Sequence, residues 1–187
     1  GEPMLELLDD DTQIYVLELS SFQLETTHQL NADVAVVLNV SEDHMDRYSS
    51  FAHYHLAKHR IFKGCKKIVV NKDDALSQPL VSENYPKKLF TKNSPDINQF
   101  GLITDGSDTF LAKGFTRLVN VNELGLMGSH NYCNYLAALA LCESLGYSVD
   151  QLIDGLKSFK GLTHRCEKIA TINNVTFIND SKATNVG

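Results

Sequence analysis

Residues 14–25 read IYVLELSSFQLE, and this stretch decides the class of fold that the chain adopts. Its first half is apolar and continuous, as in a strand that is buried on both faces of a parallel sheet. The run then passes through the carboxylate of Glu18 to Ser20, which can cap a helix together with Gln23. We therefore expect a buried strand over 14–19, with an acid at the end where α/β proteins bind their ligands.

Two further runs have the same continuous apolar pattern. They are DVAVVLNV at 33–40 and KKIVVN at 66–71. A helical segment at 51–62 separates them and stops at Gly64. This order of strand, helix, strand, helix and strand predicts an α/β fold with a mainly parallel sheet flanked by helices.

The pattern changes between 87 and 124. The turn DGSD at 105–108 separates two strand-like runs, which predicts a hairpin and a small antiparallel unit. Two helices are expected after it, over 131–145 and 148–159, the first ending at a glycine that suits a helix C-terminus.

The last segment, KIATINNVTFIND at 168–180, predicts two strands around an Asn-Asn turn. We place a domain boundary near Gly161, which divides the chain into residues 1–161 and residues 162–187. The second part is too short to be a domain of its own. We therefore expect it to begin a further domain of a longer protein.

The composition excludes several classes of protein. The chain has 187 residues and a net charge of −6, whereas a nucleic-acid or membrane-surface protein usually has an excess of basic residues. No apolar run is long enough to cross a bilayer. The cysteines show no CxxC or zinc spacing, so we expect free thiols in a reducing compartment. They are Cys65, Cys133, Cys142 and Cys166.

Polar side chains follow the first two expected strands. Glu18 ends the first, and NVSEDHMD at 39–46 brings His44 and Asp46 after the second. In a parallel sheet both ends face one crevice, where an acid and an imidazole can hold a hard cation completed by phosphate and water oxygens. The alternative, that His44 and Asp46 only bind loop backbone and cap the next helix, stays open.

The helix at 51–62 carries two candidate features. His55 and His59 have the i, i+4 spacing of a zinc site, but Leu56 stands where the metalloprotease motif has a glutamate, so solvated histidines are favoured. Lys58, by sequence alone, is an ordinary solvated lysine.

Asn131 and Asn134 lie three residues apart at the start of a helix, so they share a face and suit the edge of a planar base. Capping of the helix by Ser129 or Asn131 is the equal alternative. Further along, Arg165 and the run NDSKATN at 179–185 offer groups that suit a phosphate or carboxylate ligand. The sequence contains no GxxxxGK[ST] phosphate loop.

Six segments in this order resemble the Mur ligase family, and most closely its D-glutamate-adding members. They are VLELSSFQLE, LNVSEDHMDRY, LAKHRIF, GSHNYCNYLAALAL, GLTHRCE and NDSKATN. The resemblance implies that residues 1–161 are most of a P-loop-type central ATP-binding domain, and that residues 162–187 begin a Rossmann-like C-terminal domain. The phosphate loop would then lie upstream of Gly1.

The resemblance also implies a reaction. ATP phosphorylates the carboxylate of UDP-N-acetylmuramoyl-L-alanine, and the amine of D-glutamate attacks the acyl phosphate, in bacterial peptidoglycan synthesis. The parent enzyme would be a cytoplasmic monomer that uses Mg²⁺ and needs neither nucleic acid nor membrane insertion. These 187 residues alone would be inactive, because the triphosphate site is absent.

Site residues follow from the matching motifs. The Mg²⁺ ligands would be Glu18, His44 and Lys58, the last as a carbamate. The ATP contacts would be Asn131, Asn134, Arg165 and Asp180. The substrate side would comprise Ser20, Lys182 and Thr184, with His44, Lys58 and Lys182 taking part in catalysis. Two other functions remain as alternatives: a metal-dependent phosphohydrolase and a non-catalytic nucleotide-binding fragment.

Overall fold

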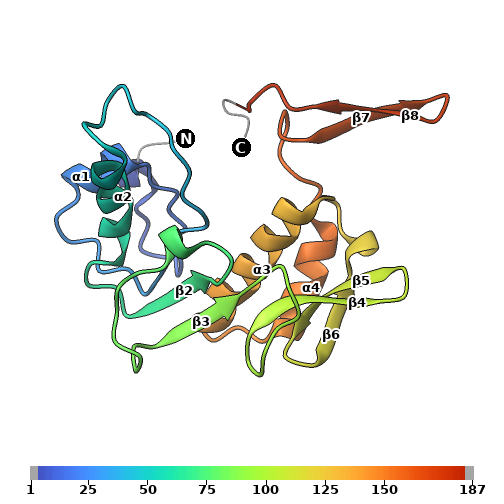
Figure 1. Ribbon diagram of the computed structural model, residues 1–187, viewed down its shortest axis with the longest axis horizontal. Helices are drawn as coiled ribbons and strands as arrows, with labels where there is room; N and C mark the ends of the chain where they lie inside the picture. Colours follow the sequence, from blue (N-terminus) through green and yellow to red (C-terminus); the bar gives the residue numbers. More distant parts are fainter. Residues whose placement is uncertain (1–3, 184–187) are drawn as a thin grey trace.

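The computed structural model describes residues 4–183, in which six strands form one mixed sheet in the order of the sequence (Figure 1). The strands are β1 (Val34–Val36), β2 (Lys67–Asn71), β3 (Lys87–Phe90), β4 (Phe100–Asp105), β5 (Asp108–Lys113) and β6 (Thr116–Asn120). The first four pair in parallel, and β4, β5 and β6 pair antiparallel. The α/β class and the mainly parallel sheet are therefore confirmed.

The hairpin predicted around residues 105–108 is present, with Asp105 paired to Asp108 and Gly106 at φ 60°. The predicted small antiparallel unit is confirmed as β4, β5 and β6, and β4 joins it to β3 through the pair Phe90 and Phe100. The antiparallel strands therefore extend the same sheet instead of forming a layer of their own.

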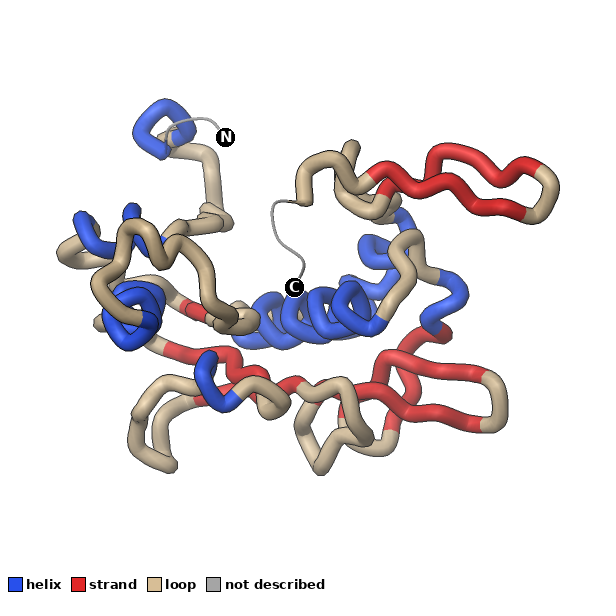
Figure 2. The backbone as a smooth tube through the Cα atoms, turned by 45° about the horizontal axis from the view of Figure 1, so that its top comes forward, coloured by secondary structure: helices blue, strands red, loops and turns tan. Residues whose placement is uncertain are grey.

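Helices pack against the sheet, and the longest of them lies along one of its faces (Figure 2). They are α1 (Ser21–Thr26), α2 (Phe51–His59), α3 (Ser129–Ser144) and α4 (Val149–Ser158), with short 3-10 turns η1 (Met4–Leu7), η2 (Arg60–Phe62), η3 (Ala75–Ser77) and η4 (Val121–Glu123). Side chains on β2 alternate between the two layers. Val69 packs in the cluster under α3, whereas Ile68 and Val70 pack with residues of η2 on the opposite face.

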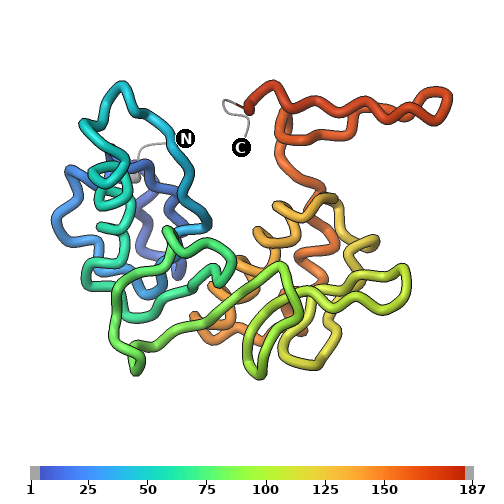
Figure 3. The backbone as a smooth tube through the Cα atoms, in the orientation of Figure 1, coloured from blue at the N-terminus to red at the C-terminus, as the bar shows by residue number. Residues whose placement is uncertain are grey.

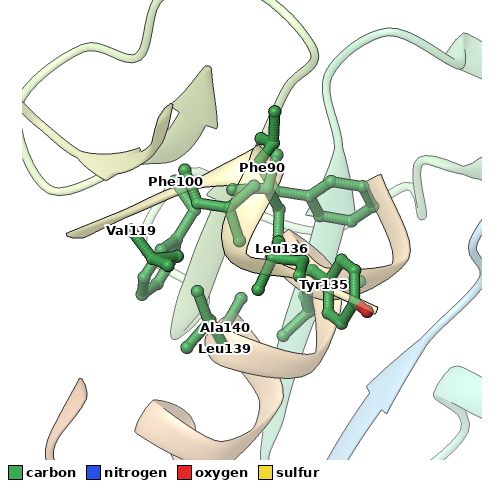
Figure 4. Packing of buried hydrophobic residues seen from close by; sticks show 12 residues of the cluster. Phe90, Phe100, Val119, Tyr135, Leu136, Leu139 and Ala140 are labelled. Carbon is green, nitrogen blue, oxygen red and sulfur yellow. The ribbon is translucent and has the colours of Figure 1, made fainter. Parts of the chain in front are cut away.

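The largest apolar cluster joins α3 to strands β2 to β6. Leu136 and Leu139 of α3 meet Phe90, Phe100 and Val119 of the sheet, all almost fully buried (Figure 4). This packing holds α3 rigidly across the sheet. The residues at the start of α3, including both predicted base-binding asparagines, are therefore on a fixed support.

The helix ends follow the sequence signals. Ser20 Oγ accepts from Gln23 N–H, and Gln23 Oε1 accepts from Ser20 N–H, which completes the predicted capping box. Gly64 and Gly146 have φ values of 72° and 100°, the left-handed conformation expected after a helix end. All four cysteines are free, as expected.

The strand predicted over 14–19 is wrong. These residues belong to no helix or strand and pair with no strand among residues 4–183, and Val16 is 91% exposed. A cavity of about 330 Å³ lies between this segment and Val34 and Ala35 of β1, so the two backbones do not form a ladder. The strand expected over 33–40 is also shorter, because only β1 pairs with β2.

The last described elements are β7 (Glu167–Ile172) and β8 (Val175–Asn179), an antiparallel hairpin that projects from the rest of the chain (Figures 1 and 3). Asn173 and Asn174 form its turn with φ values of 50° and 62°, as the sequence predicts. The domain boundary near Gly161 stays a prediction. Within residues 4–183, no helix combines the length and the apolar character needed to cross a bilayer.

Candidate functional site

Glu18 precedes α1 by three residues and has an exposed side chain. None of the ion pairs among the described residues involves it. Ser20, predicted on the substrate side, has its hydroxyl engaged in the α1 capping box. The Glu18 carboxylate is therefore open to a ligand, whereas the Ser20 hydroxyl already has a structural partner.

His44 lies in the left-handed region at φ 55°, which is uncommon for a residue with a side chain. Its ring lies 4.9 Å from the Phe22 ring of α1 and 6.4 Å from the Tyr54 ring of α2, measured between centroids. The next helix is capped by Ser50, not by Asp46. The capping alternative for this loop is therefore wrong, and His44 instead joins an aromatic cluster between α1 and α2.

Lys58 belongs to the same region. Its Nζ lies 5.3 Å from the centroid of the Tyr54 ring, and the side chain is half-buried, not freely solvated. No carboxylate among the described residues lies within ion-pair distance of it. The structure thus places His44 and Lys58 around one buried ring.

The described residues alone do not make a complete metal site. No group of three or more His, Cys, Asp or Glu side chains suited to a metal occurs within residues 4–183. Glu18 and His44 supply at most two donors, and a carbamate on Lys58 would add oxygen. This donor set suits a hard cation that takes its other ligands from phosphate and water oxygens.

A second region is a cavity of about 660 Å³ between the start of α3, α4 and the segment that leads into β7. Its polar lining includes all four residues predicted to contact the nucleotide: Asn131, Asn134, Arg165 and Asp180. Apolar side chains complete the wall, among them Leu126, Tyr135, Ala138, Leu156, Phe159 and Leu162. An apolar cavity with a few convergent polar groups is the usual form of a small-molecule site.

The polar groups of this cavity are partly held by backbone. Asn131 is buried, and its Nδ2 donates to the Met127 carbonyl at 2.8 Å. The N-cap of α3 is Gly128, which makes no side-chain capping bond, so capping by Ser129 or Asn131 does not occur. Asn134, one turn further along, is exposed.

On the opposite side of the cavity, Asp180 Oδ1 accepts from the Cys166 N–H at 3.0 Å. Arg165 and Lys182 are exposed, and the Lys182 N–H donates to the His164 carbonyl. This backbone pairing brings the turn after β8 against the residues before β7. Thr184, predicted near D-glutamate, lies outside the described residues.

Sequence reasoning missed the apolar half of the cavity and the ring of Tyr54. Tyr135 and Ala138 lie four and seven residues after Asn131, on the same face of α3. Helical spacing therefore contained a signal for them. Helical spacing also relates Tyr54 to Lys58 on α2, but nothing in the sequence pattern showed that Tyr54 would contact His44 as well.

His55 and His59 do not form a zinc site. Each ring places Nε2 2.7 Å from the same acceptor, the Leu76 carbonyl, so both Nε2 atoms carry a proton. The two rings lie 4.0 Å apart between centroids. They fasten α2 to η3, which is a structural role.

This contact makes stability depend on pH. Burial is the largest cause that lowers the pKa of His59 below its ordinary value of 6.5. The unfolded chain therefore binds this proton at a higher pH than the folded chain, and stability is lost as the pH falls below about 6.5. We expect His59→Gln to flatten this part of the profile in urea unfolding at pH 7.5, 6.5 and 5.5, whereas exposed His28→Gln leaves it unchanged. An identical slope for His59→Gln and the parent would contradict this assignment.

Comparisons with known proteins all find similarity to Mur ligases. The profile of the Mur ligase middle domain matches residues 2–142. The chain is 54% identical over its whole length to the UDP-N-acetylmuramoylalanine–D-glutamate ligases of Acinetobacter baylyi and Pseudomonas aeruginosa. It spans 42% of the length of each of these relatives.

Solved structures show the same fold at lower identity. A pseudomurein peptide ligase type C from Methanothermus fervidus is 23% identical with a TM-score of 0.62, over 80% of this chain and 38% of that one. The UDP-N-acetylmuramate–alanine ligase of Thermotoga maritima is 22% identical with a TM-score of 0.62, over 86% of this chain and 36% of that one.

Proposed function

Because the chain belongs to the Mur ligase family, we propose that it is part of an ATP-dependent ligase that joins D-glutamate to UDP-N-acetylmuramoyl-L-alanine in peptidoglycan synthesis. These substrates are the ones named for relatives that match the whole chain at 54% identity. The chain covers only 42% of those relatives. We therefore assign the activity to the full-length ligase that carries these residues, and expect the 187 residues alone to be inactive.

The observation that carries the proposal is the cavity at the start of α3. It collects four predicted nucleotide contacts from positions as far apart in the chain as Asn131 and Asp180. Amide groups beside apolar walls suit a purine, and the Arg165 guanidinium suits a phosphate oxygen. The residues present therefore fit ATP.

When bound, ATP supplies the phosphoryl group that activates the alanine carboxylate, and Mg²⁺ neutralises charge on the phosphate oxygens. The chain's own residues would hold and orient these groups. Glu18 and His44 would hold the cation, and Lys182 would lie on the substrate side. Catalysis would then rest on positioning and electrostatic stabilisation by these residues.

Each of the two alternative functions predicts a different result when D-glutamate is omitted or added. A metal-dependent phosphohydrolase would release phosphate without D-glutamate, and a nucleotide-binding fragment would bind ATP without turnover. The test supplies the full-length protein with ATP, Mg²⁺ and UDP-N-acetylmuramoyl-L-alanine, with and without D-glutamate. We expect phosphate release only when D-glutamate is present. Release without it, or no release, would overturn the ligase proposal.

The nucleotide cavity gives a second prediction. Replacing Asn134 with leucine, a good helix former, should keep α3 intact and remove one polar contact from the cavity. We expect the KM for ATP to rise about tenfold, the value of one net hydrogen bond.

The matched control is Asn122→Leu, which changes an exposed asparagine outside the cavity. It should leave the KM for ATP unchanged. An equal KM for Asn134→Leu and the parent would place the base elsewhere.

A further inference from the structure

Tyr54 is the one buried ring that both His44 and Lys58 contact among the described residues. Its side chain is 5% exposed, with Lys58 Nζ 5.3 Å from its centroid and the His44 ring 6.4 Å away at an interplanar angle of 71°. The lysine lies one helical turn after the tyrosine on α2, so the helix itself aligns this pair.

Other rings hold Tyr54 in place. Tyr48 lies 5.3 Å from it in an edge-to-face arrangement and stacks on Phe22 at 5.8 Å. Phe22 in turn contacts His44 at 4.9 Å. This closed group of aromatic contacts leaves the Tyr54 ring little freedom, because buried rings pack at a density that resists displacement.

The Lys58 ammonium lies over the face of the Tyr54 ring. No ion pair among the described residues includes Lys58, so no carboxylate neutralises its charge there. A cation over a desolvated ring gains attraction that an aliphatic side chain of similar size does not provide.

We propose that Tyr54 is a positioning residue, which holds Lys58 Nζ and the His44 imidazole around one buried ring so that both serve the same cation site. This rests on the proposed function. Carbamylation requires that the Lys58 ammonium first loses one proton. The neutral Nζ then joins the carbon of CO₂, releases a second proton, and leaves a carboxylate on the side chain. The ring would hold the amine in place before this step, and the remaining N–H can lie over its face afterwards.

The test measures the reactivity of the Lys58 amine in the full-length ligase. A limiting amount of acetic anhydride acetylates accessible neutral amines, and peptide mass spectrometry gives the ratio of labelling at Lys58 to that at exposed Lys63. We expect Tyr54→Leu and Tyr54→Met to raise this ratio about fivefold, because the amine loses the ring face that it packs against and becomes more accessible to the reagent. Tyr54→Phe, which keeps the ring, should leave the ratio at the parent value.

An unchanged ratio in both the leucine and the methionine variants would overturn the proposal. Loss of folding would be distinguished from loss of positioning, because it would raise labelling at every lysine and alter the circular dichroism spectrum. Two aliphatic variants are used, so that if one of them does not fold, the other still tests the proposal.

A second readout separates positioning from a purely structural role. In the full-length ligase, Tyr54→Leu should lower kcat with little change in the KM for ATP, because the nucleotide cavity does not include Tyr54. Tyr54→Phe, which keeps the ring, should have the same kcat as the parent enzyme. A rise in the KM for ATP equal to the fall in kcat would contradict positioning. If the parent protein shows no D-glutamate-dependent turnover, the proposed function fails, while the labelling ratio still decides the role of Tyr54.

Discussion

Replacing Glu18 with glutamine should lower turnover of the full-length ligase by about a hundredfold or more and leave the fold unchanged. The carboxylate is exposed and takes part in none of the ion pairs among the described residues, so its loss removes no ion pair that supports the chain. Glutamine keeps the shape but removes the negative charge that a hard cation prefers.

The measurement is kcat at saturating substrates over a range of Mg²⁺ concentrations. A lost metal ligand should also raise the Mg²⁺ concentration needed for half-maximal turnover. The control is Glu83→Gln, which changes another exposed glutamate with no predicted role. Near-normal kcat for Glu18→Gln at low Mg²⁺ would remove Glu18 from the metal site.

Local rules in the sequence predicted much of the fold. The Ser20 capping box, the glycine helix ends and the two hairpin turns depend on residues close together in the chain, and each is present. The strand predicted over 14–19, in contrast, requires a second strand to pair with it. Its apolar sequence satisfies strand propensity, but a strand exists only where another backbone pairs with it, and a cavity separates this segment from β1.

The residues of the candidate site also divide into those that local spacing predicts and those that it does not. Asn131 and Asn134 are linked by helical spacing, so their shared face was predictable. Their meeting with Arg165 and Asp180 was implied only by the family resemblance, because no pattern in the sequence relates positions that far apart. Helical spacing likewise relates Tyr54 to Lys58. The approach of His44 to Tyr54 depends on how α1, α2 and the loop between β1 and α2 pack, which no local rule specifies.

Replacing Lys58 with alanine should also lower kcat of the full-length ligase by about a hundredfold, and short carboxylic acids should restore part of it. The family resemblance implies a carbamate at this position, and a carbamate is a carboxylate attached to the lysine nitrogen. Removing the half-buried side chain leaves space beside the Tyr54 ring. Formate or acetate can enter that space and supply the missing oxygens to the cation.

The design separates a carbamate from an ammonium. If Lys58 acts as a cation, an added anion has the wrong charge, and a small amine should restore activity instead. Sodium chloride at the same ionic strength tests for a general salt effect, and Lys63→Ala tests for a general effect of losing a lysine near the end of α2. Rescue of Lys58→Ala by acetate, with none by chloride or methylamine, supports the carbamate. Rescue by methylamine alone would assign Lys58 a positive charge in the reaction, and its place in the site would then be to bind an anionic oxygen of the substrate and not the metal.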